Sequence, residues 1–262
     1  MKIISLNLQI DNKKLAKVAQ FLDAEKADFV FLQEVLVEDD INAADKINNL
    51  MEDPFAHIAV DKVETYTTSK GRTYTQAQAV LVRDKLAEVA TECLELAPIS
   101  GDKHTRISQN IQINYYHDEA DFPPHPELPS KTYDFANVHF GNRADSWRQL
   151  KDTIEHNNQK WRNAIIIGDF NMTRETLMKS KHFWGAQYKS SPEFAQYTSF
   201  PSSSEFSQID FCLIPQSMKF VNIKTFEGLS DHKAILYEID ESGDSDIFNY
   251  NLPAKIAENT IL

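Results

Sequence analysis

The chain has 262 residues, a formal net charge of −12 at pH 7 and an isoelectric point near 5.1. This length fits one large domain with a sizeable core. The acidic balance argues against a general nucleic-acid coat protein, which would be basic. It leaves room for an enzyme that meets phosphate groups through a metal ion and a few local cations.

The cysteines and the first residues indicate the compartment. With only two cysteines, Cys93 and Cys212, no disulfide framework is expected and a reducing compartment is favoured. Residues 1–10 are too short and too polar, at Asn7 and Gln9, for a signal peptide. No apolar run approaches the ~20 residues that a membrane span needs. We therefore expect a cytoplasmic monomer without a membrane span.

The N-terminal half combines strand and helix patterns. Leu15, Val18, Ala19 and Leu22 follow the spacing of one helix face, and Gly71 marks a turn. The elements expected here are strands at Lys2–Gln9, Asp28–Gln33, His57–Val60, Val63–Thr68, Gln78–Arg83 and Ile107–Tyr116, with helices at 13–25 and Asn42–Met51.

The C-terminal half begins with segment 118–130, which holds four of the ten prolines and is expected to be a surface loop. Residues 172–206 are expected to be irregular, with room for one short helix. The regular elements expected are a helix at Trp147–Trp161 and strands at Asp134–Phe140, Ile165–Ile167, Gln208–Ile214, Phe220–Phe226 and Lys233–Ile239. This pattern predicts one domain over 1–240, followed by a polar tail over 241–262.

The stretch Ile165–Asn171 (IIIGDFN) has the strongest pattern in the chain. Its three β-branched apolar residues predict a fully buried strand, which Gly168 is expected to end at a sharp turn. The alternation of an extended chain would then point Asp169 and Asn171 to one side. Asp and Asn also favour turns after strands, but a carboxylate and an amide at the end of a buried strand must be satisfied or used.

Polar residues end other predicted strands as well. They are Asn7, Glu34, His139, Asp169, Asn171, Asp210, Asp231 and His232. Each has an ordinary structural alternative, such as a turn cap or a satisfied core amide, but together they favour strand ends that converge on one cleft. Hard oxygen ligands such as Glu34 and Asp231, without Cys or paired-His spacing, suit Mg²⁺ or Mn²⁺ rather than Zn²⁺.

With the motifs SLN, LQE, NVH, IIIGDFN, QIDF and LSDH, the chain resembles the endonuclease/exonuclease/phosphatase superfamily from Ile3 to about Ile239. This superfamily comprises the deoxyribonuclease-I-like metal-dependent phosphoesterases. The resemblance implies an α/β fold, a four-layer α-β-β-α sandwich of two mixed β-sheets with helices on both outer faces. We expect the two strand-rich halves of the chain to supply one sheet each.

The resemblance also implies roles for the polar residues. Glu34 matches the principal metal ligand, with Asn7 beside it and Asp231 near the metal. Asp169 and Asn171 match residues that orient the nucleophilic water and hold the scissile phosphate.

Five further residues match the proton-transfer and phosphate-binding positions. Asp210 and His232 match an acid–histidine pair, in which the carboxylate orients and charges the imidazole. His139 matches a second histidine found in the pancreatic-type deoxyribonuclease and sphingomyelinase branches. Tyr74 matches a tyrosine near the phosphate, and Arg106 falls where the family often has an arginine before a strand.

The chain departs from the deoxyribonuclease pattern at Gln76, where a glutamate would partner the histidine matched to His139. A neutral amide cannot favour the imidazolium, so we expect His139 to be mostly neutral at pH 7. The cysteines and secretory segment of the secreted enzymes are missing too, which argues against an extracellular digestive role.

The predicted function is metal-dependent hydrolysis of a phosphodiester, by in-line attack of water, with Mg²⁺ or Mn²⁺ as cofactor. A DNase-like endonuclease or exonuclease acting on DNA is favoured. The alternative is a phosphatase or phosphodiesterase acting on a small-molecule or lipid phosphoester, because fold does not settle substrate. A non-catalytic binding module with a decayed site is the third hypothesis.

Overall fold

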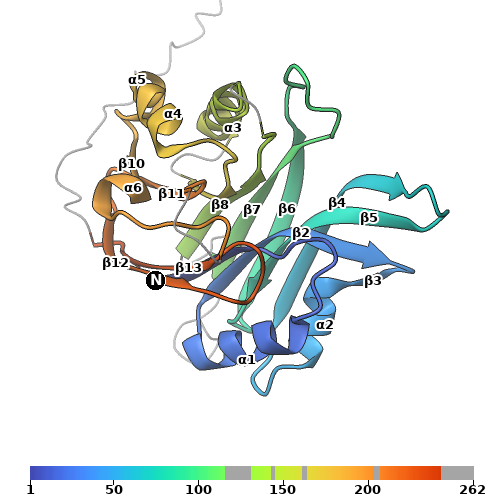
Figure 1. Ribbon diagram of the computed structural model, residues 1–262. Coiled ribbons are helices and arrows are strands. Elements are labelled where there is room, and N and C mark those ends of the chain that lie inside the picture. Colours follow the sequence, from blue (N-terminus) through green and yellow to red (C-terminus); the bar gives the residue numbers. More distant parts are fainter. Residues whose placement is uncertain (116–130, 143–144, 161–163, 203–206, 243–262) are drawn as a thin grey trace, which may run out of the picture.

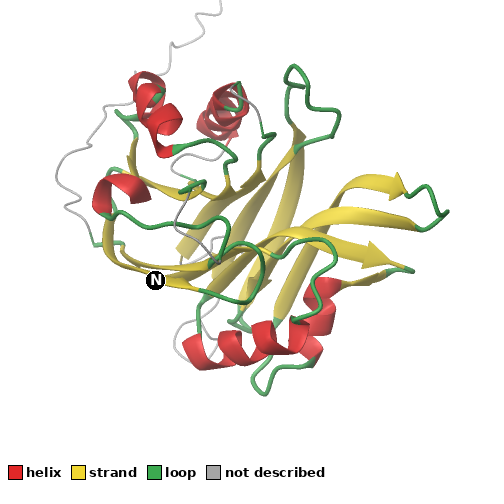
Figure 2. Cartoon of the chain, in the orientation of Figure 1, coloured by secondary structure: helices red, strands yellow, loops and turns green. Residues whose placement is uncertain are grey.

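The computed structural model describes residues 1–115, 131–142, 145–160, 164–202 and 207–242. Two β-sheets pack face to face, and helices cover both outer faces (Figures 1 and 2). The predicted four-layer α/β sandwich is therefore confirmed. The loop expected at 118–130 and all but the first two residues of the expected tail lie outside the described residues.

The first sheet combines both ends of the chain. Its strands are β1 (Lys2–Asn7), β2 (Phe29–Glu38), β3 (Ile41–Asn42), β4 (His57–Thr67), β5 (Thr73–Val82), β12 (Lys219–Phe226) and β13 (Ala234–Asp240). Their order is β12-β13-β1-β2-β5-β4, with β3 paired to β2. The sheet is mixed, because β1 and β2 run parallel while the other pairs are antiparallel.

The second sheet comes from the middle of the chain. Its strands are β6 (Ala87–Glu95), β7 (Ile107–Tyr115), β8 (Lys131–His139), β9 (Ile165–Asp169), β10 (Tyr188–Ser190) and β11 (Asp210–Pro215). Their order is β10-β11-β9-β8-β7-β6, and β8 and β9 are parallel.

The expectation that each half of the chain supplies one sheet is wrong. Strands β12 and β13 return to the first sheet, where β13 pairs with β1. Ile235, Tyr237 and Ile239 of β13 are buried in the core between the sheets. This placement completes the apolar face of the first sheet and covers the free edge of β1.

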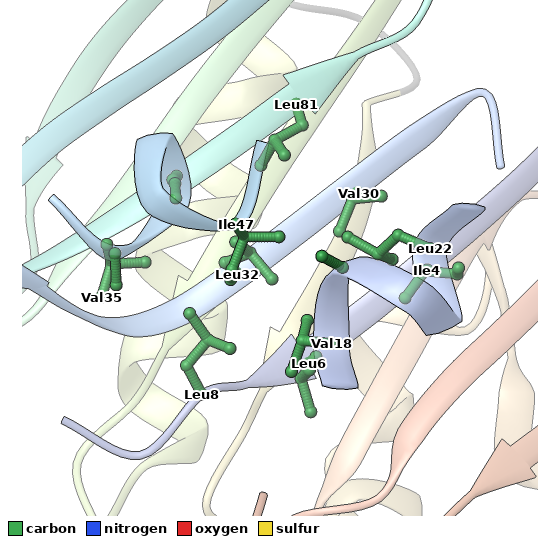
Figure 3. Packing of buried hydrophobic residues seen from close by; sticks show 14 of the residues in the cluster. Ile4, Leu6, Leu8, Val18, Leu22, Val30, Leu32, Val35, Ile47 and Leu81 are labelled. Carbon is green, nitrogen blue, oxygen red and sulfur yellow. The ribbon is translucent and has the colours of Figure 1, made fainter. Parts of the chain in front are cut away.

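Helices on the outer faces create the remaining cores. Helices α1 (Leu15–Glu25) and α2 (Ala43–Asn49) pack on the first sheet. Figure 3 shows Leu22 and Val18 of α1 and Ile47 of α2 against strand residues such as Ile4 and Leu32. On the second sheet lie α3 (Trp147–Lys160), α4 (Arg174–Lys179) and α5 (Lys181–Trp184), and α6 (Ser191–Phe194) adjoins β11.

Three local predictions differ from the structure. The expected strands at 57–60 and 63–68 form one continuous strand, β4, whose pairing with β5 shifts register between Lys62 and Glu64. Strand β6 was not predicted, because it lies at a sheet edge and its exposed glutamates weaken the apolar pattern. The region 172–206 holds α4, α5, β10 and α6 rather than one short helix.

Two further features concern the cysteines and the helices. Cys93 and Cys212 are both free thiols, as the absence of a disulfide framework predicted. Within the described ranges, no helix is both long and apolar enough to cross a membrane.

Candidate active site

A cleft of about 610 Å³ opens where several strands end. His139 and Asp169, the last residues of β8 and β9, line it. Most of the other predicted residues line the same cleft: Glu34, Tyr74, Gln76, Arg106, Asn171, Asp231 and His232. Asn7 and Asp210 are buried directly behind it and are bonded to residues that line it. The structure thus brings all of the predicted site residues together.

Glu34 was predicted to end a strand. It lies instead within β2, at an irregularity that points it to the cleft. The pairing of β2 with β5 shifts register between Leu32 and Val35, and Glu34 has a φ of 52°. Such a bulge bends the strand and re-aims a side chain. Here it turns the carboxylate toward the cleft, where Asn7 Nδ2 donates to Oε1 at 3.2 Å and the backbone N of Ile10 donates to Oε2 at 3.3 Å.

Gly168 does not end the buried strand, which corrects the predicted sharp turn. It pairs within β9 with Val138 of β8 and Phe211 of β11. Its φ is +141°, and a Cβ atom there would lie 2.1 Å from the carbonyl oxygen of Val138. Glycine is therefore required for the close approach of β8 and for the backbone angle, and β9 continues to Asp169.

Asn171 follows in a left-handed conformation with a φ of 48°, so the predicted extended alternation of Asp169 and Asn171 is wrong. The backbone N of Asn171 donates to Asp169 Oδ1 at 2.8 Å. Its side chain is anchored too, because Nδ2 donates to the carbonyl oxygen of Phe140 at 2.9 Å. Both residues still line the cleft, through a tight turn instead of an extended chain.

Asp169 lies at the centre of the site with 1 % of its surface exposed. Its Oδ2 accepts from Asn7 Nδ2 at 3.1 Å and lies 3.7 Å from His139 Nε2 and 3.8 Å from His232 Nε2. Burial, followed by the nearby charge of Asp210, raises the pKa of Asp169 to about 7. A carboxylate with this pKa is suited to take up a proton near neutral pH.

His232 and Asp210 form the predicted acid–histidine pair. His232 Nδ1 lies 2.9 Å from Asp210 Oδ2 and 3.1 Å from Oδ1. Burial disfavours the charged imidazole, but the charge and hydrogen bond of Asp210, with Asp169 and Asp231, outweigh it and raise the pKa of His232 to about 10. At neutral pH the ring is therefore an imidazolium, which acts as a charged hydrogen-bond donor rather than a base.

The pKa of His139 is shifted in the opposite direction to that of His232. Gln76 Nε2 lies 3.2 Å from His139 Nδ1, as the alignment of Gln76 predicted, and Arg106 Nη1 lies 3.3 Å from Nε2. Burial, Arg106 and His232 lower the pKa of His139 well below its usual value. The ring is thus neutral at pH 7, as expected, and burial is the first cause, followed by the charge of Arg106.

Arg106 has a partner that the sequence did not reveal. Its Nε donates to Asp102 Oδ2 at 3.0 Å, and the two side chains are 11 % and 7 % exposed. The i, i+4 spacing is the signal that could have indicated the pair. The ion pair fixes the guanidinium beside His139 and offsets its charge.

Tyr66 was also missed. Its hydroxyl lies 2.8 Å from Glu64 Oε2, 3.2 Å from Gln76 Oε1 and 3.2 Å from His104 Nδ1. The predicted Tyr74 stacks on the Tyr66 ring at 5.5 Å between centroids. Tyr66 therefore contacts the partner of His139 directly. Its alternation with Glu64 in β4 was the available signal, because both face the same side of the strand.

One group of described residues has the spacing to hold a metal ion. Asp169, Asp210 and His232 each offer a ligand atom, and these atoms lie within 4.8 Å of one another. The bond between His232 Nδ1 and Asp210 occupies two of those groups. We therefore expect this triad to act in proton transfer rather than in metal binding.

The ligands predicted from sequence give a second donor set. The Glu34 side chain is 28 % exposed, so its oxygens are accessible from the cleft. Asn7 Oδ1 accepts from the backbone N of Gln9 at 3.0 Å, so Asn7 presents its Nδ2 to the carboxylates. Asp231 lines the cleft, with Oδ1 accepting from Ser230 Oγ at 3.0 Å. Carboxylate oxygens of this kind fit a hard divalent cation.

Comparison with known sequences decides the family. Residues 4–232 match the sequence model of the "Endonuclease/Exonuclease/phosphatase family". The chain belongs to this family. Its members are hydrolytic phosphoesterases, as the motifs at the strand ends predicted. A search of the curated proteins finds no match to the chain.

Solved structures share the endonuclease/exonuclease/phosphatase fold. A family member from Leptotrichia buccalis superposes with a TM-score of 0.68 at 15 % identity, over 92 % of this chain and 99 % of its own. A mannosyl-6-phosphatase from Bacteroides thetaiotaomicron gives 0.59 at 15 % identity, over 92 % and 99 %. A 3′ phosphatase from Neisseria, bound to a product DNA hairpin, gives 0.57 at 15 % identity, over 92 % and 99 %. At such identities the likeness shows the fold alone.

Proposed function

We propose that this chain is a divalent-metal-dependent phosphodiester hydrolase of the deoxyribonuclease type, with Mg²⁺ or Mn²⁺ as its cofactor. One observation carries the proposal: a buried carboxylate, Asp169, lies 3.7 Å from a neutral histidine and 3.8 Å from a charged one. Proton acceptor and charged donor are thus held apart in one cleft. This arrangement suits attack of water on a phosphoester, in which one group takes the proton of the water and another stabilises charge on the phosphate.

Asp169 is assigned as the group that takes the proton from the attacking water. The new bond joins the water oxygen to phosphorus, and the bond to the leaving oxygen breaks on the opposite side. His232 donates a charged hydrogen bond to a non-bridging phosphate oxygen, and Asp210 keeps the imidazole charged and oriented. Asn171, anchored on the carbonyl oxygen of Phe140, fixes the turn that orients Asp169 toward the water.

The metal is assigned to the Glu34 side of the cleft, with Asp231 near it. When bound, the ion supplies Lewis-acid stabilisation of charge on the phosphate or the leaving oxygen. Asn7 Nδ2 donates to both Glu34 and Asp169. It therefore keeps the two carboxylates close together without a cation to offset their repulsion. His139 and Arg106 lie side by side in the cleft and contribute neutral and cationic hydrogen bonds to the phosphate, and Tyr74 lines the same cleft.

The second candidate function is hydrolysis of a small or lipid phosphoester. It is favoured because the arginines near the cleft are already paired with carboxylates. Arg106 is bonded to Asp102, and Arg72, beside Tyr74, is bonded to Glu38 and Asp11. Proteins that hold long nucleic acids use basic side chains on successive phosphates, and this chain carries a net charge of −12. A phosphatase or phosphodiesterase for a small or lipid phosphoester needs no such row of cations. The free thiols of Cys93 and Cys212 support a reducing compartment for either function, and we propose that the protein is a cytoplasmic monomer.

A substrate screen tests the proposal. Plasmid DNA, single-stranded DNA, RNA, bis(p-nitrophenyl) phosphate and phospholipid are each incubated with Mg²⁺ or Mn²⁺, with His232→Ala as the inactive control. DNA cleavage that weakens steeply with salt supports the nuclease. Turnover of small esters alone supports the second candidate. Folded protein that hydrolyses none of these substrates contradicts both.

A further inference from the structure

Three buried amides connect the two sheets directly behind the cleft. Gln33 of β2 and Asn137 of β8 are 0 % exposed, and Gln78 of β5 is 2 % exposed. Figure 1 shows β2 and β5 in one sheet and β8 in the other. We call these residues the cross-sheet clamp. Buried amides are costly in an apolar core unless they are bonded, so their bonds indicate what they are for.

Asn137 reaches from the second sheet to the bulge that presents Glu34. Its Nδ2 donates to the carbonyl oxygens of Leu32 at 3.1 Å and Ala79 at 3.2 Å. These two residues are the last regular pair before the register of β2 and β5 shifts. A bulge interrupts the ladder of backbone hydrogen bonds. The side chain of Asn137 therefore supports the irregular backbone from outside the sheet.

Gln33, immediately before Glu34, strengthens this link. Its Nε2 donates to Asn137 Oδ1 at 2.7 Å. Its Oε1 is buried without a hydrogen-bond partner among the described residues. An unsatisfied buried acceptor is destabilising, and an apolar side chain at this position would avoid that loss of stability. A clamp that contains an unbonded buried acceptor is not optimised for stability alone.

Gln78 makes the reverse connection, from the first sheet to the backbone around His139. In the amide orientation that satisfies both neighbouring backbone groups, its nitrogen donates to the carbonyl oxygen of Asn137 at 3.0 Å, and its oxygen accepts from the backbone N of His139 at 3.0 Å. The orientation is assigned from these two partners, because the opposite one would face each backbone group with a group of the same kind. Two residues earlier in β5, Gln76 contacts the His139 ring at Nδ1. The same strand thus holds both the backbone and the side chain of His139.

We propose that Gln78 and Asn137 are positioning residues that set the distance between the two halves of the active site. Glu34 belongs to the first sheet and His139 to the second, and their Oε1 and Nε2 atoms lie 3.7 Å apart. The clamp bonds the backbone next to each of them to the opposite sheet. This inference rests on the proposed hydrolase function, which needs both residues at one phosphate.

Gln78→Met tests the clamp, because it keeps the length of the side chain and removes both amide bonds. Turnover of bis(p-nitrophenyl) phosphate with Mg²⁺ is measured, together with hydrogen exchange of the His139 backbone amide in metal-free protein. Misplacement of reacting groups by an ångström can cost about 100-fold. We expect kcat to fall about 10- to 100-fold with KM within about twofold, and the His139 amide to lose exchange protection.

Gln216→Met is the control. Gln216 Nε2 also bonds two backbone carbonyls, those of Gly185 at 3.0 Å and Tyr188 at 2.9 Å, but Gln216 neither lines the cleft nor bonds a clamp residue. We expect it to lower the melting temperature as much as Gln78→Met while kcat stays at the wild-type value. An equal loss of kcat in both variants would mean that the amides only stabilise the fold, and the proposal would be wrong.

Asn137→Leu is the stronger perturbation, and if it fails to fold, Gln78→Met decides. Wild-type kcat and wild-type exchange protection in folded Gln78→Met overturn the clamp. If wild-type protein hydrolyses no phosphoester, the proposed function fails by itself. The exchange experiment then decides separately: loss of protection at His139 in Gln78→Met but not in Gln216→Met supports the clamp, and equal protection in both variants overturns it.

Discussion

Replacing Asp210 by asparagine removes one charge from the centre of the site while keeping the size of the side chain. Asp210 is 2 % exposed and its carboxylate lies 2.9 Å from His232 Nδ1, so solvent cannot replace the lost interaction. A hydrogen bond to a charged group is worth about 1.5–3 kcal/mol. If His232 must be charged at the phosphate, kcat/KM should fall about tenfold to about 150-fold.

The pKa of His232 provides a second readout of Asp210→Asn. In the wild type we expect the imidazole proton to be retained until about pH 10, and in the variant the pKa should fall toward the usual 6.5. Because the folded-state pKa is the higher one, the stabilisation from this pair is present below about pH 6.5 and is lost as pH rises toward 10. Urea unfolding of the variant should therefore show a weaker loss of stability across that window.

NMR titration of the His232 ring and steady-state kinetics on bis(p-nitrophenyl) phosphate measure these effects. The double variant Asp210→Asn/His232→Ala should be little slower than His232→Ala, because residues that act as one unit give non-additive losses. Fully additive losses, or an unchanged His232 pKa, would refute the pairing. A large rise in the Mg²⁺ needed for half-maximal rate would instead indicate that Asp210 binds the metal.

Three further predictions concern single features. Gln76→Glu places a carboxylate about 3.2 Å from His139 Nδ1, so it should raise the His139 pKa and move the acid limb of kcat/KM to higher pH, because the neutral ring is the form assigned to the phosphate; an unchanged profile, with His139→Ala equally silent, removes His139 from the mechanism. Gly168→Ala should lower the free energy of unfolding by at least about 2 kcal/mol in urea, because its Cβ meets the Val138 carbonyl, and wild-type stability would refute that contact. Ending the chain after Ser242 keeps the hydrogen bond between Tyr133 and Glu241, so turnover of a small phosphodiester should stay near normal. Loss of this turnover in a truncated protein that is still folded would assign a role to residues 243–262.

The sequence was sufficient for most of the strands and for the residues of the cleft because those signals are local, whereas the four-layer sandwich was implied by the family resemblance. Buried strands such as Ile165–Asp169 are marked by their own apolar residues, and polar residues directly after them mark the cleft. Asp169, His139 and His232 could therefore be placed in one site without knowledge of the pairing of strands.

The errors arose where long-range pairing decides the local backbone. Whether Glu34 ends a strand or sits at a bulge depends on how β2 pairs with β5. The role of Gly168 depends on the carbonyl of Val138 in the neighbouring strand. In the same way, Gln78 and Asn137 are ordinary strand residues until the two sheets are brought face to face. Periodicity within one strand contains none of this information.

In the proposed mechanism Glu34 holds the metal at which the phosphoester is hydrolysed. The most direct measurement is the rate of wild-type protein and of Glu34→Gln on the best substrate, with Mg²⁺ and in excess EDTA. Removing one charged ligand should slow hydrolysis by about 100-fold or more in a protein that is still folded, and EDTA should abolish wild-type activity. Hydrolysis by Glu34→Gln at the wild-type rate, in Mg²⁺ or in excess EDTA, would contradict the assignment.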